Sequence, residues 1–294
     1  MIALRMLGWL AALGLGGASS RVDIIGIPEP FAPGIASTRH AEVRLTLSPD
    51  GNTALWFSRD RPGGPGGYDI WISHRTPAGW GLARPVSFNS PGRDFDPAFS
   101  SDGRFVYFCS DRAGGSGGDD LYRVKVIAGS FGPAANLGPA INSTGSEFAP
   151  MLSPDGRTLL FSSDRSGGAG GHDLFTARRN PAGFAAARRL PGAVNTAANE
   201  FDATFLRDGA TIIFARAMDF RKDRVELFHA APGAHGYDMG TRLPATVNND
   251  EDNYGAMLDW SDRDRLTFSG RRGKEGGMDL YRIHYRIVAN ASGE

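Results

Sequence analysis

Acidic residues recur at one position of a repeated pattern in this chain of 294 residues. The recurring acids, 52 or 53 residues apart, are Glu42, Asp94, Glu147 and Glu200. Two further acids, Asp96 and Asp202, stand two residues after the second and the fourth of them. A pair of carboxylates set across a sugar acts as acid and as base or nucleophile in glycosidases. Gathered in one place, such side chains can instead bind a sugar, a peptide or a cation.

Repetition favours an architectural role for most of these acids, because a site for one small ligand rarely needs a copy in every unit. Arginine recurs as well, at Arg61, Arg112, Arg165 and Arg272, whereas Met218 stands at that position in the fourth unit. We expect each acid to pair with an arginine or to accept a backbone N–H in its own or a neighbouring unit. A second set of acids is expected to hold its own loops: Asp69, Asp120, Asp173 and Asp279, with Glu226 as the equivalent in the fourth unit.

The first unit departs from the repetition. It carries Arg39 and His40 where the other units have small residues. It also has Arg44 at the position that Asp96 and Asp202 occupy in the second and fourth units. A specific ligand is most readily recognised where the units differ, so these residues are candidates for a binding site.

The fourth unit replaces its glycine loop with AMDFRKDR, which places Phe220 and Arg221 on an exposed turn. An aromatic residue flanked by basic side chains can anchor a protein partner; the alternative is a long loop without such a role. The candidate residues for binding a ligand or partner are therefore Arg39, His40, Arg44, Asp94, Asp96, Glu147, Glu200, Asp202, Phe220 and Arg221.

Motifs for metal and phosphate chemistry are missing from the sequence. It contains no HExxH, no cluster of His and Cys at zinc spacing and no GK[ST] phosphate loop. The glycine loops have the form GGxGG and recur about every 53 residues, whereas calcium-binding nonapeptides repeat without such gaps. We predict no cofactor, with calcium as the alternative, and we expect the glycines to let the chain turn with positive φ.

A repeated segment must position these residues. The run SRDRPGGPGGYDIW from Ser58 recurs as CSDRAGGSGGDDLY from Cys109 and SSDRSGGAGGHDLF from Ser162, and partly as SGRRGKEGGMDLY from Ser269. The phenylalanine before each run recurs at spacings of 51, 53, 53 and 54 residues, at Phe57, Phe108, Phe161, Phe214 and Phe268. A period in that range marks the units of a propeller or a solenoid.

Each unit has the pattern of four short antiparallel strands. In the third unit these are EFAPMLS from Glu147, RTLLFSS, HDLFTARR and FAAARRLPGAVN, separated by turn residues and the glycine loop. Five such units predict an all-β, five-bladed β-propeller of four-stranded antiparallel blades, with six blades as the alternative. The loops after second and fourth strands then open on one face, where the recurring acids lie.

The two ends of the chain are expected to close the ring. The last unit stops after its third strand near Tyr285, and the segment from about Val22 to Ser37 resembles a fourth strand with no unit before it. Pairing the two completes the last blade and removes open sheet edges. The predicted propeller therefore spans residues 21–285, followed by a tail at 286–294.

These repeats resemble the PD40 family, the WD40-like units of TolB-type propellers. The resemblance rests on SPDG at Ser48 and Ser153, SSDG at Ser100, the SDR segments, and the DLY or DIW that opens third strands. It covers nearly the whole chain from about Ile35 to Tyr285. It implies a periplasmic propeller with a binding role and leaves the ligand open.

Charge and the N-terminal sequence bear on partners and location. The net charge is zero, with 32 basic and 32 acidic residues, which gives no reason to expect nucleic acid as a partner. Residues 1–20 combine Arg5, an apolar run and small residues, the pattern of a secretory signal peptide. A membrane anchor, the alternative, needs about 20 apolar residues.

We therefore expect a periplasmic or secreted monomer that is not inserted in a membrane after removal of the signal. Its expected function is that of a non-enzymatic binding or scaffold module that presents its loop face to a protein or a cell-envelope glycan. The alternative is a carbohydrate-active enzyme that uses carboxylates at the central funnel.

Overall fold

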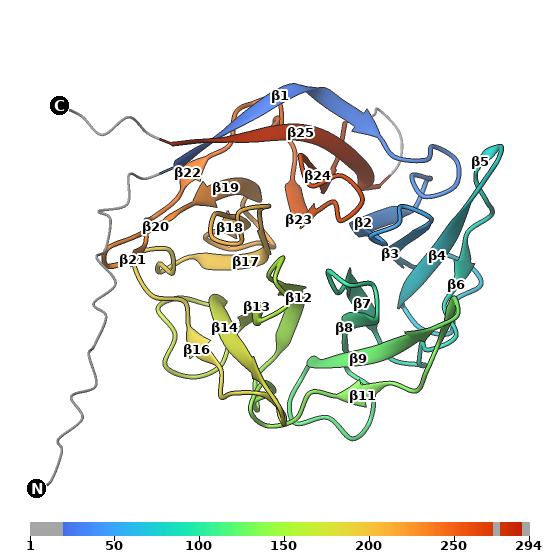
Figure 1. Ribbon diagram of the computed structural model, residues 1–294, viewed down its shortest axis with the longest axis horizontal. Helices are drawn as coiled ribbons and strands as arrows, with labels where there is room; N and C mark the ends of the chain where they lie inside the picture. Colours follow the sequence, from blue (N-terminus) through green and yellow to red (C-terminus); the bar gives the residue numbers. More distant parts are fainter. Residues whose placement is uncertain (1–19, 273–276, 290–294) are drawn as a thin grey trace, which may run out of the picture.

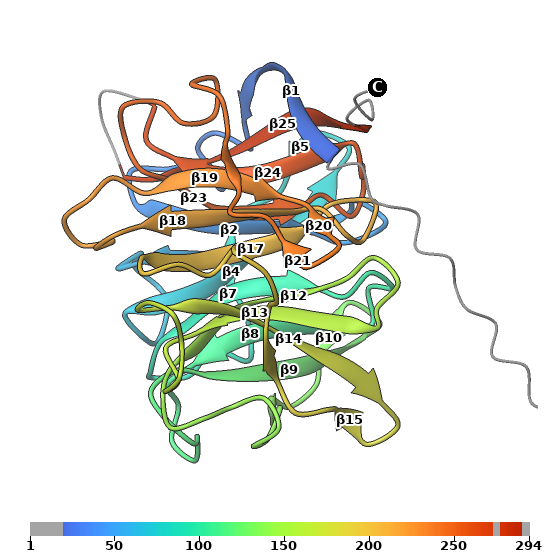
Figure 2. The ribbon, with the colours of Figure 1, turned by 90° about the vertical axis from the view of Figure 1, so that its left-hand side faces the viewer.

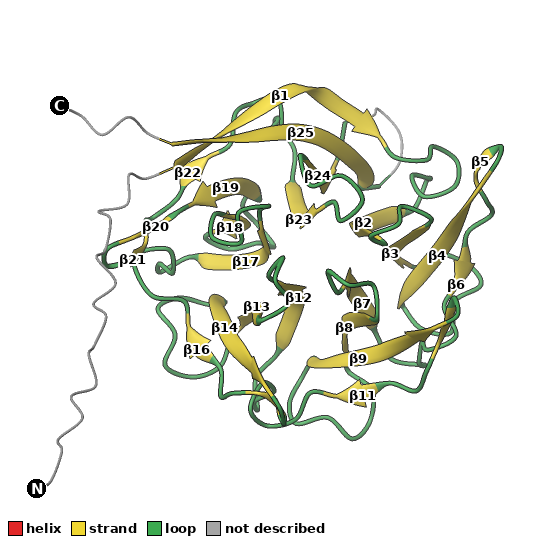
Figure 3. Cartoon of the chain, in the orientation of Figure 1, coloured by secondary structure: helices red, strands yellow, loops and turns green. Residues whose placement is uncertain are grey.

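The computed structural model describes residues 20–272 and 277–289, which form five blades around a central axis (Figure 1). These residues lie in strands, turns and irregular segments, and none of them is in a helix (Figure 3). The same part of the chain accordingly contains no helix that could cross a membrane. The prediction of an all-β, five-bladed propeller is confirmed, and the six-bladed alternative is wrong.

Each blade is an antiparallel sheet whose first strand lies nearest the axis (Figure 1). The first strands are β2 (Ala41–Leu47), β7 (Asp94–Phe99), β12 (Glu147–Leu152), β17 (Asn199–Phe205) and β23 (Asn253–Leu258). The second strands are β3 (Thr53–Arg59), β8 (Phe105–Ser110), β13 (Thr158–Ser163), β18 (Ile212–Ala217) and β24 (Arg265–Gly270). The third strands are β4 (Tyr68–Thr76), β9 (Asp120–Ile127), β14 (Asp173–Asn180), β19 (Glu226–Ala230) and β25 (Asp279–Ala289).

The outermost strands of the first four blades are shorter than predicted. In the first three blades two short strands pair with the third strand: β5 (Gly79–Trp80) and β6 (Arg84–Pro85), β10 (Ser130–Phe131) and β11 (Ala135–Asn136), and β15 (Gly183–Phe184) and β16 (Arg188–Arg189). In the fourth blade the outermost strand is β22 (Thr241–Arg242), and a separate hairpin consists of β20 (Pro232–Gly233) and β21 (Gly236–Tyr237). Within the predicted fourth segment FAAARRLPGAVN, only Phe184 of β15 and the two residues of β16 lie in strands. After Leu190 the chain leaves for the next blade, and Pro191 has no N–H to donate to a ladder.

Strand β1 (Ser20–Pro30) closes the ring. It pairs antiparallel with β25, from Ser20 opposite Ala289 to Pro30 opposite Tyr281, and is the outermost strand of the last blade (Figure 1). The N-terminal segment thus completes this blade as predicted. Two boundaries differ, because β1 ends at Pro30 rather than Ser37 and β25 continues to Ala289, past the predicted start of the tail. The predicted signal peptide lies outside the described residues except for Ser20.

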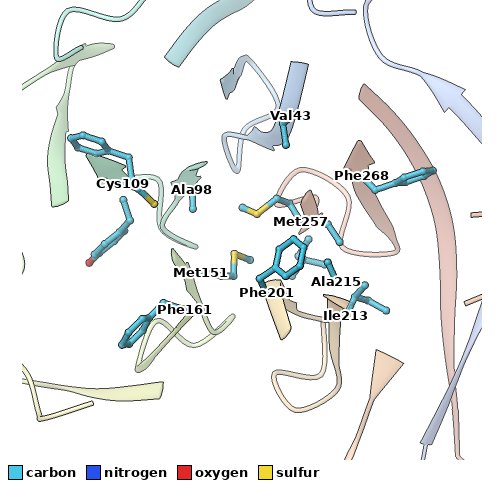
Figure 4. Close-up of a cluster of buried hydrophobic side chains, with 14 of the residues drawn as sticks. Val43, Ala98, Cys109, Met151, Phe161, Phe201, Ile213, Ala215, Met257 and Phe268 are labelled. Carbon is cyan, nitrogen blue, oxygen red and sulfur yellow. The ribbon is translucent and has the colours of Figure 1, made fainter. Parts of the chain in front are cut away.

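The hydrophobic core extends between the blades and across the axis. The phenylalanines that mark the period from the second unit onward are fully buried on the second strands: Phe108, Phe161, Phe214 and Phe268. Figure 4 shows Met151 of β12 and Met257 of β23 extending into the space that the first strands surround. Both methionines are fully buried. Side chains therefore fill the ring at this level and fix the first strands in place.

Removing β1 is expected to destabilise the whole propeller. A chain that starts at Phe31 leaves the edge of β25 unpaired and takes Val22 out of the main core. The melting temperature should fall by on the order of 10 °C, measured by circular dichroism. Adding a peptide of residues 20–30 should restore part of the loss, and a shortened chain that melts with the parent would show that ring closure is dispensable.

Candidate functional site

Every first strand contains a β-bulge at the same position. The ladder between first and second strands is interrupted after Val43, Phe95, Phe148, Phe201 and Tyr254. The next residue in each blade has a φ between 51° and 66°: Arg44, Asp96, Ala149, Asp202 and Gly255. A bulge adds one residue that has no partner in the ladder and bends the strand. In each of the five blades the bulge thus leaves one residue near the axis without a partner in the strand ladder.

Three of these residues form a buried ion cluster. Arg44 Nε lies 3.9 Å from Asp96 Oδ1, and Arg44 Nη1 lies 3.5 Å from Asp202 Oδ1. Arg44 Nη2 donates a hydrogen bond of 3.2 Å to the carbonyl oxygen of Pro150. The exposed fractions of Arg44, Asp96 and Asp202 are 0%, 3% and 5%. The side chain of Arg44 therefore reaches from the first blade to the second, third and fourth, and the structure brings together three of the candidate residues.

The two carboxylates also tie neighbouring blades together. Asp96 Oδ2 accepts a hydrogen bond of 3.1 Å from Ala149 N–H, and Asp202 Oδ2 accepts one of 3.0 Å from Gly255 N–H. Burial raises the pKa of Asp96 well above its ordinary value; the charge of Asp202 raises it further, and Arg44 lowers it. Burial also raises the pKa of Asp202 against the effect of Arg44. Because one guanidinium faces two carboxylates, burial favours a proton on the pair.

A cavity of about 410 Å³ opens next to this cluster on the face of the interblade loops. Asp96 and Asp202 belong to its lining. The residues that precede the five bulges form a ring within it: Val43, Phe95, Phe148, Phe201 and Tyr254. Phe57, Tyr68 and Phe220 add further aromatic wall. The cavity therefore combines an aromatic wall with charged residues, the two buried acids among them, and this is a composition found in ligand pockets.

Aromatic contacts hold the walls of the cavity. The rings of Phe57 and Tyr68 stack at 5.7 Å, and Phe95 meets the Phe57 ring edge-on at the same distance. On the other side, Phe220 packs on Phe201 at 5.9 Å and on His172 at 5.7 Å. Rings at such separations stabilise one another beyond the burial of their area. The walls are therefore supported before any ligand arrives.

Phe220 lies where the sequence predicted, on the turn between β18 and β19. That turn extends on the side of the ring opposite to the β14–β15 hairpin (Figure 2). The exposed fraction of Phe220 is 43%, and the guanidinium of Arg221 lies 5.8 Å from its ring centre. Phe220 lines the cavity, whereas Arg221 does not belong to the lining. The aromatic residue of this candidate pair is thus part of the site, and Arg221 lies beside it.

The recurring acids do not line the cavity. Glu147 accepts hydrogen bonds from Ser143 N–H (2.8 Å), Ser163 Oγ (2.7 Å) and Arg165 Nη2 (3.0 Å). Asp94 accepts hydrogen bonds from Ser90 Oγ and Arg112 in the same way. Glu42 accepts one from Thr38 N–H and forms an ion pair of 3.8 Å with Arg61. All of these carboxylates are fully buried. They act as the architectural interpretation expects, and Asp94, Glu147 and Glu200 are not placed at the site.

The fourth unit has an arginine after all. The sequence pattern assigned its arginine position to Met218, but Arg216 of β18 donates a hydrogen bond of 2.7 Å from Nε to Glu200. Its guanidinium lies over the rings of Phe214 and Phe228, as that of Arg165 lies over Phe161 and Phe175 in the third unit. Met218 does stand at the aligned position, but the role of the arginine is taken by Arg216, because an arginine can reach its acid from the strand as well as from the loop.

Arg39 and His40 lie on the connection that leads into β2. Arg39 is exposed, and His40 is partly buried and donates its backbone N–H to Thr38 Oγ1 at 3.2 Å. Burial and the nearby charges of Arg39 and Arg61 lower the pKa of His40. Neither residue lines the cavity, so the structure separates these two candidates from Arg44.

Positive φ explains only some of the glycines in the glycine loops. In the first three blades one glycine per loop has it: Gly63, Gly114 and Gly167. At the glycine that follows each of them, a Cβ atom would collide with the aspartate that opens the third strand. Asp120, for example, accepts hydrogen bonds from Ser116 N–H (2.7 Å) and Gly117 N–H (3.3 Å). The expectation that these glycines allow the chain to turn is therefore incomplete, because the close approach of each loop to its aspartate also requires glycine.

No group of three or more His, Cys, Asp or Glu side chains suited to a metal ion occurs in residues 20–272 and 277–289.

Replacing a recurring acid should destabilise the protein. Glu147→Ala and Glu200→Ala each leave a partly buried arginine without its carboxylate, which should lower the free energy of unfolding by about 3–5 kcal/mol. Urea unfolding measures the change. The control is Glu226→Ala, whose carboxylate pairs with the exposed Arg224 and Arg242 and should cost no more than about 1 kcal/mol. Variants of Glu147 and Glu200 that unfold like the parent would contradict the architectural role.

Replacing Arg44 should give a destabilisation that depends on pH. Arg44→Met leaves two buried carboxylates without a cation, at a cost of about 3–5 kcal/mol at pH 8. The folded-state pKa values of Asp96 and Asp202 are raised, so the folded protein binds protons more tightly than the unfolded chain and regains stability as pH falls. Unfolding at pH 8 and pH 5 should therefore show a smaller loss at pH 5, with the exposed Arg39→Met as control. An equal loss at both pH values would show that the pair does not titrate with folding.

Comparison with known proteins identifies the fold. No protein-family model and no curated protein sequence matches the chain. Among solved structures, TolB from Acinetobacter baumannii is 13% identical over 85% of this chain, with a TM-score of 0.52, and the chain spans 56% of its length. The endo-arabinase from Bacteroides thetaiotaomicron is 13% identical over 92% of this chain and 99% of its own, with a TM-score of 0.55. The α-L-arabinofuranosidase from Lactobacillus brevis is 9% identical over 86% of this chain and 92% of its own, with a TM-score of 0.56. At these identities the likeness shows the fold alone, a β-propeller.

Proposed function

We propose that this protein is a non-enzymatic binding module that takes a ligand or a segment of a partner into the cavity of its loop face. The observation that carries the proposal is the cavity of about 410 Å³ with aromatic wall and two buried aspartates. Concave, mostly apolar pockets with a few convergent polar groups are where proteins bind small ligands and protruding side chains. The walls come from every blade, so a bound group would contact the whole ring.

The sequence supports a location and a family for this module. The charged, apolar and small residues of the first 20 positions are those of an export signal, which favours a periplasmic or secreted protein. The SPDG, SDR and DLY segments favour membership of the PD40 repeat family. A partner in that compartment is a protein or an envelope glycan, and the closed ring favours a monomer.

The surroundings of the two cavity acids favour binding over hydrolysis. Asp96 and Asp202 each accept one backbone N–H from the next blade, and each faces Arg44. A glycosidase needs one carboxyl group that stays protonated and one that is ionised, which requires unlike surroundings. The contacts that the two aspartates share, one guanidinium and one backbone N–H each, suit a common electrostatic role.

Hydrolysis of a carbohydrate is the second candidate, favoured by two carboxylates in one cavity on a fold that arabinan-degrading enzymes share. A panel of polysaccharides and chromogenic glycosides tests it against Asp96→Asn and Asp202→Asn variants. Turnover by the parent that both variants lose would replace the binding proposal with an enzyme.

Photo-crosslinking in cell-envelope extract tests the binding proposal. A photoreactive amino acid at position 220 lies at the cavity and should yield a defined adduct. The same residue at Leu82, which is 79% exposed and outside the cavity, should not. Phe148→Ala should reduce the adduct formed from position 220, because it removes part of the wall. Equal adducts from both positions, or none from position 220, would refute binding in the cavity.

A further inference from the structure

We propose that the group bound in the cavity is an organic cation, a primary ammonium or a guanidinium, seated against Asp96 and Asp202 and enclosed by the aromatic ring. This inference rests on the proposed function, because it names the class of ligand for the same cavity. It follows from the charge of the cluster, the free acceptor capacity of its carboxylates and the aromatic residues that line the cavity.

With both aspartates ionised, the cluster is short of one positive charge. Two carboxylates and one guanidinium then leave a single negative charge among side chains that are at least 95% buried. An unneutralised buried charge is costly, and proteins pair it or protonate it. A cationic group entering the cavity would supply the missing charge at the place where both aspartates are part of the lining.

The aspartates also keep acceptor capacity for a ligand. Each uses Oδ2 for one backbone N–H, and each Oδ1 faces Arg44 at 3.5 or 3.9 Å without a hydrogen bond to it. Within the described residues, Arg44 Nε and Nη1 have no hydrogen-bond partner. An ionised carboxylate offers about four acceptor sites. The pair can therefore accept N–H donors from the cavity side without breaking an existing contact.

The walls suit the same ligand. Phe95, Phe148, Phe201 and Tyr254 come from four successive blades and belong to one ring of the cavity lining. Aromatic faces attract a cation through their quadrupoles, and enclosure by several rings is how ammonium groups are recognised without full hydration. Aromatic wall and acidic residues in one cavity thus select a cation over an anion, and over a neutral polar group.

The arginines at the mouth of the cavity are paired with acids. Arg59 and Arg271 belong to the lining, with side chains 58% and 48% exposed. Arg59 Nε lies 4.0 Å from Asp60 Oδ2, and Arg271 Nη1 lies 3.5 Å from Glu251 Oε2. The mouth therefore does not oppose the entry of a cationic group, such as the side chain of a lysine or arginine in a peptide.

A proton and the cation of the ligand compete for the negative charge of the aspartate pair. The groups that face Asp96 are Arg44 of β2, Asp202 of β17, Asp119 before β9 and the thiol of Cys109 on β8. Across the cavity lie Arg59, Tyr68, Asp252, Tyr254 and Arg271. Protonation of the aspartate pair supplies the charge that a ligand would otherwise bring, so the cation should bind more weakly as pH falls from 8 to 5.

Isothermal titration with a matched pair of compounds tests the inference on the full chain. The cationic probe is Nα-acetyl-lysine methylamide, and the neutral probe is the same compound acetylated at Nε. At pH 7.5 we expect the cation to bind at least about tenfold more tightly, the difference of a desolvated charged contact. Its affinity should fall at pH 5. Equal affinity of the two probes, or no binding of the cation, would overturn the inference.

Two variants tie the result to the cavity. Asp202→Asn keeps the shape and the acceptor for Gly255 N–H but neutralises the cluster with Arg44, and should weaken the cation about tenfold. Phe201→Leu keeps an apolar wall but removes a ring, and should weaken it several-fold. Glu226→Gln, outside the cavity, should leave binding unchanged. Cation affinity that survives Asp202→Asn overturns the inference. If the cationic probe does not bind but crosslinking at position 220 persists, the proposed class of ligand is wrong and the proposed binding function is retained. If neither binding nor crosslinking is observed, the proposed function is wrong as well.

Discussion

The β-bulge in each first strand is the constraint on which the site depends. It holds one residue per blade at positive φ, a conformation that costs a residue with a Cβ atom about 1–2 kcal/mol. Only Gly255 among the five bulge residues is a glycine. Neighbouring blades offset part of this cost, because three of the five bulge N–H groups donate across to them. Ala149 N–H donates to Asp96, Gly255 N–H to Asp202, and Arg44 N–H to Ser269 Oγ. Local strain, cohesion between blades and the floor of the cavity thus have one origin.

Away from the axis, repetition marks residues that hold blades together. The amide of Asn142 bonds to both the N–H and the C=O of Leu121, and Arg165 joins Glu147 to the carbonyl of Ile141. The same amide contact recurs at Asn89, Asn195 and Asn248. At the axis the units differ, and there the side chains meet each other and the cavity. The five-fold scaffold therefore carries a site that is not five-fold.

Most of the fold followed from the sequence, because a period near 53 residues and the split last unit leave few other arrangements. Arg44, Asp96 and Asp202 were recognised as one position of the repeat, but their contact was not, since it depends on bulges that only the pairing of strands reveals. The aromatic ring was missed for the same reason. In a regular strand Phe95 and Asp96 would point to opposite faces, and the bulge lets both reach one cavity. The signal was present as an aromatic residue just before the bulge position in four units.

The layer of side chains next to the ion cluster is apolar, which is what stability alone would favour for residues around the axis. Two residues further along the first strands, Met151 and Met257 fill the ring with apolar side chains. Replacing a buried ion cluster by well-packed apolar residues is often neutral or stabilising by about 1–4 kcal/mol. The first strands accommodate such residues one step away, yet three charged side chains occupy the level that borders the cavity. The proposed binding of a cation would account for charged side chains at this level, beside the hydrogen bonds by which they join neighbouring blades.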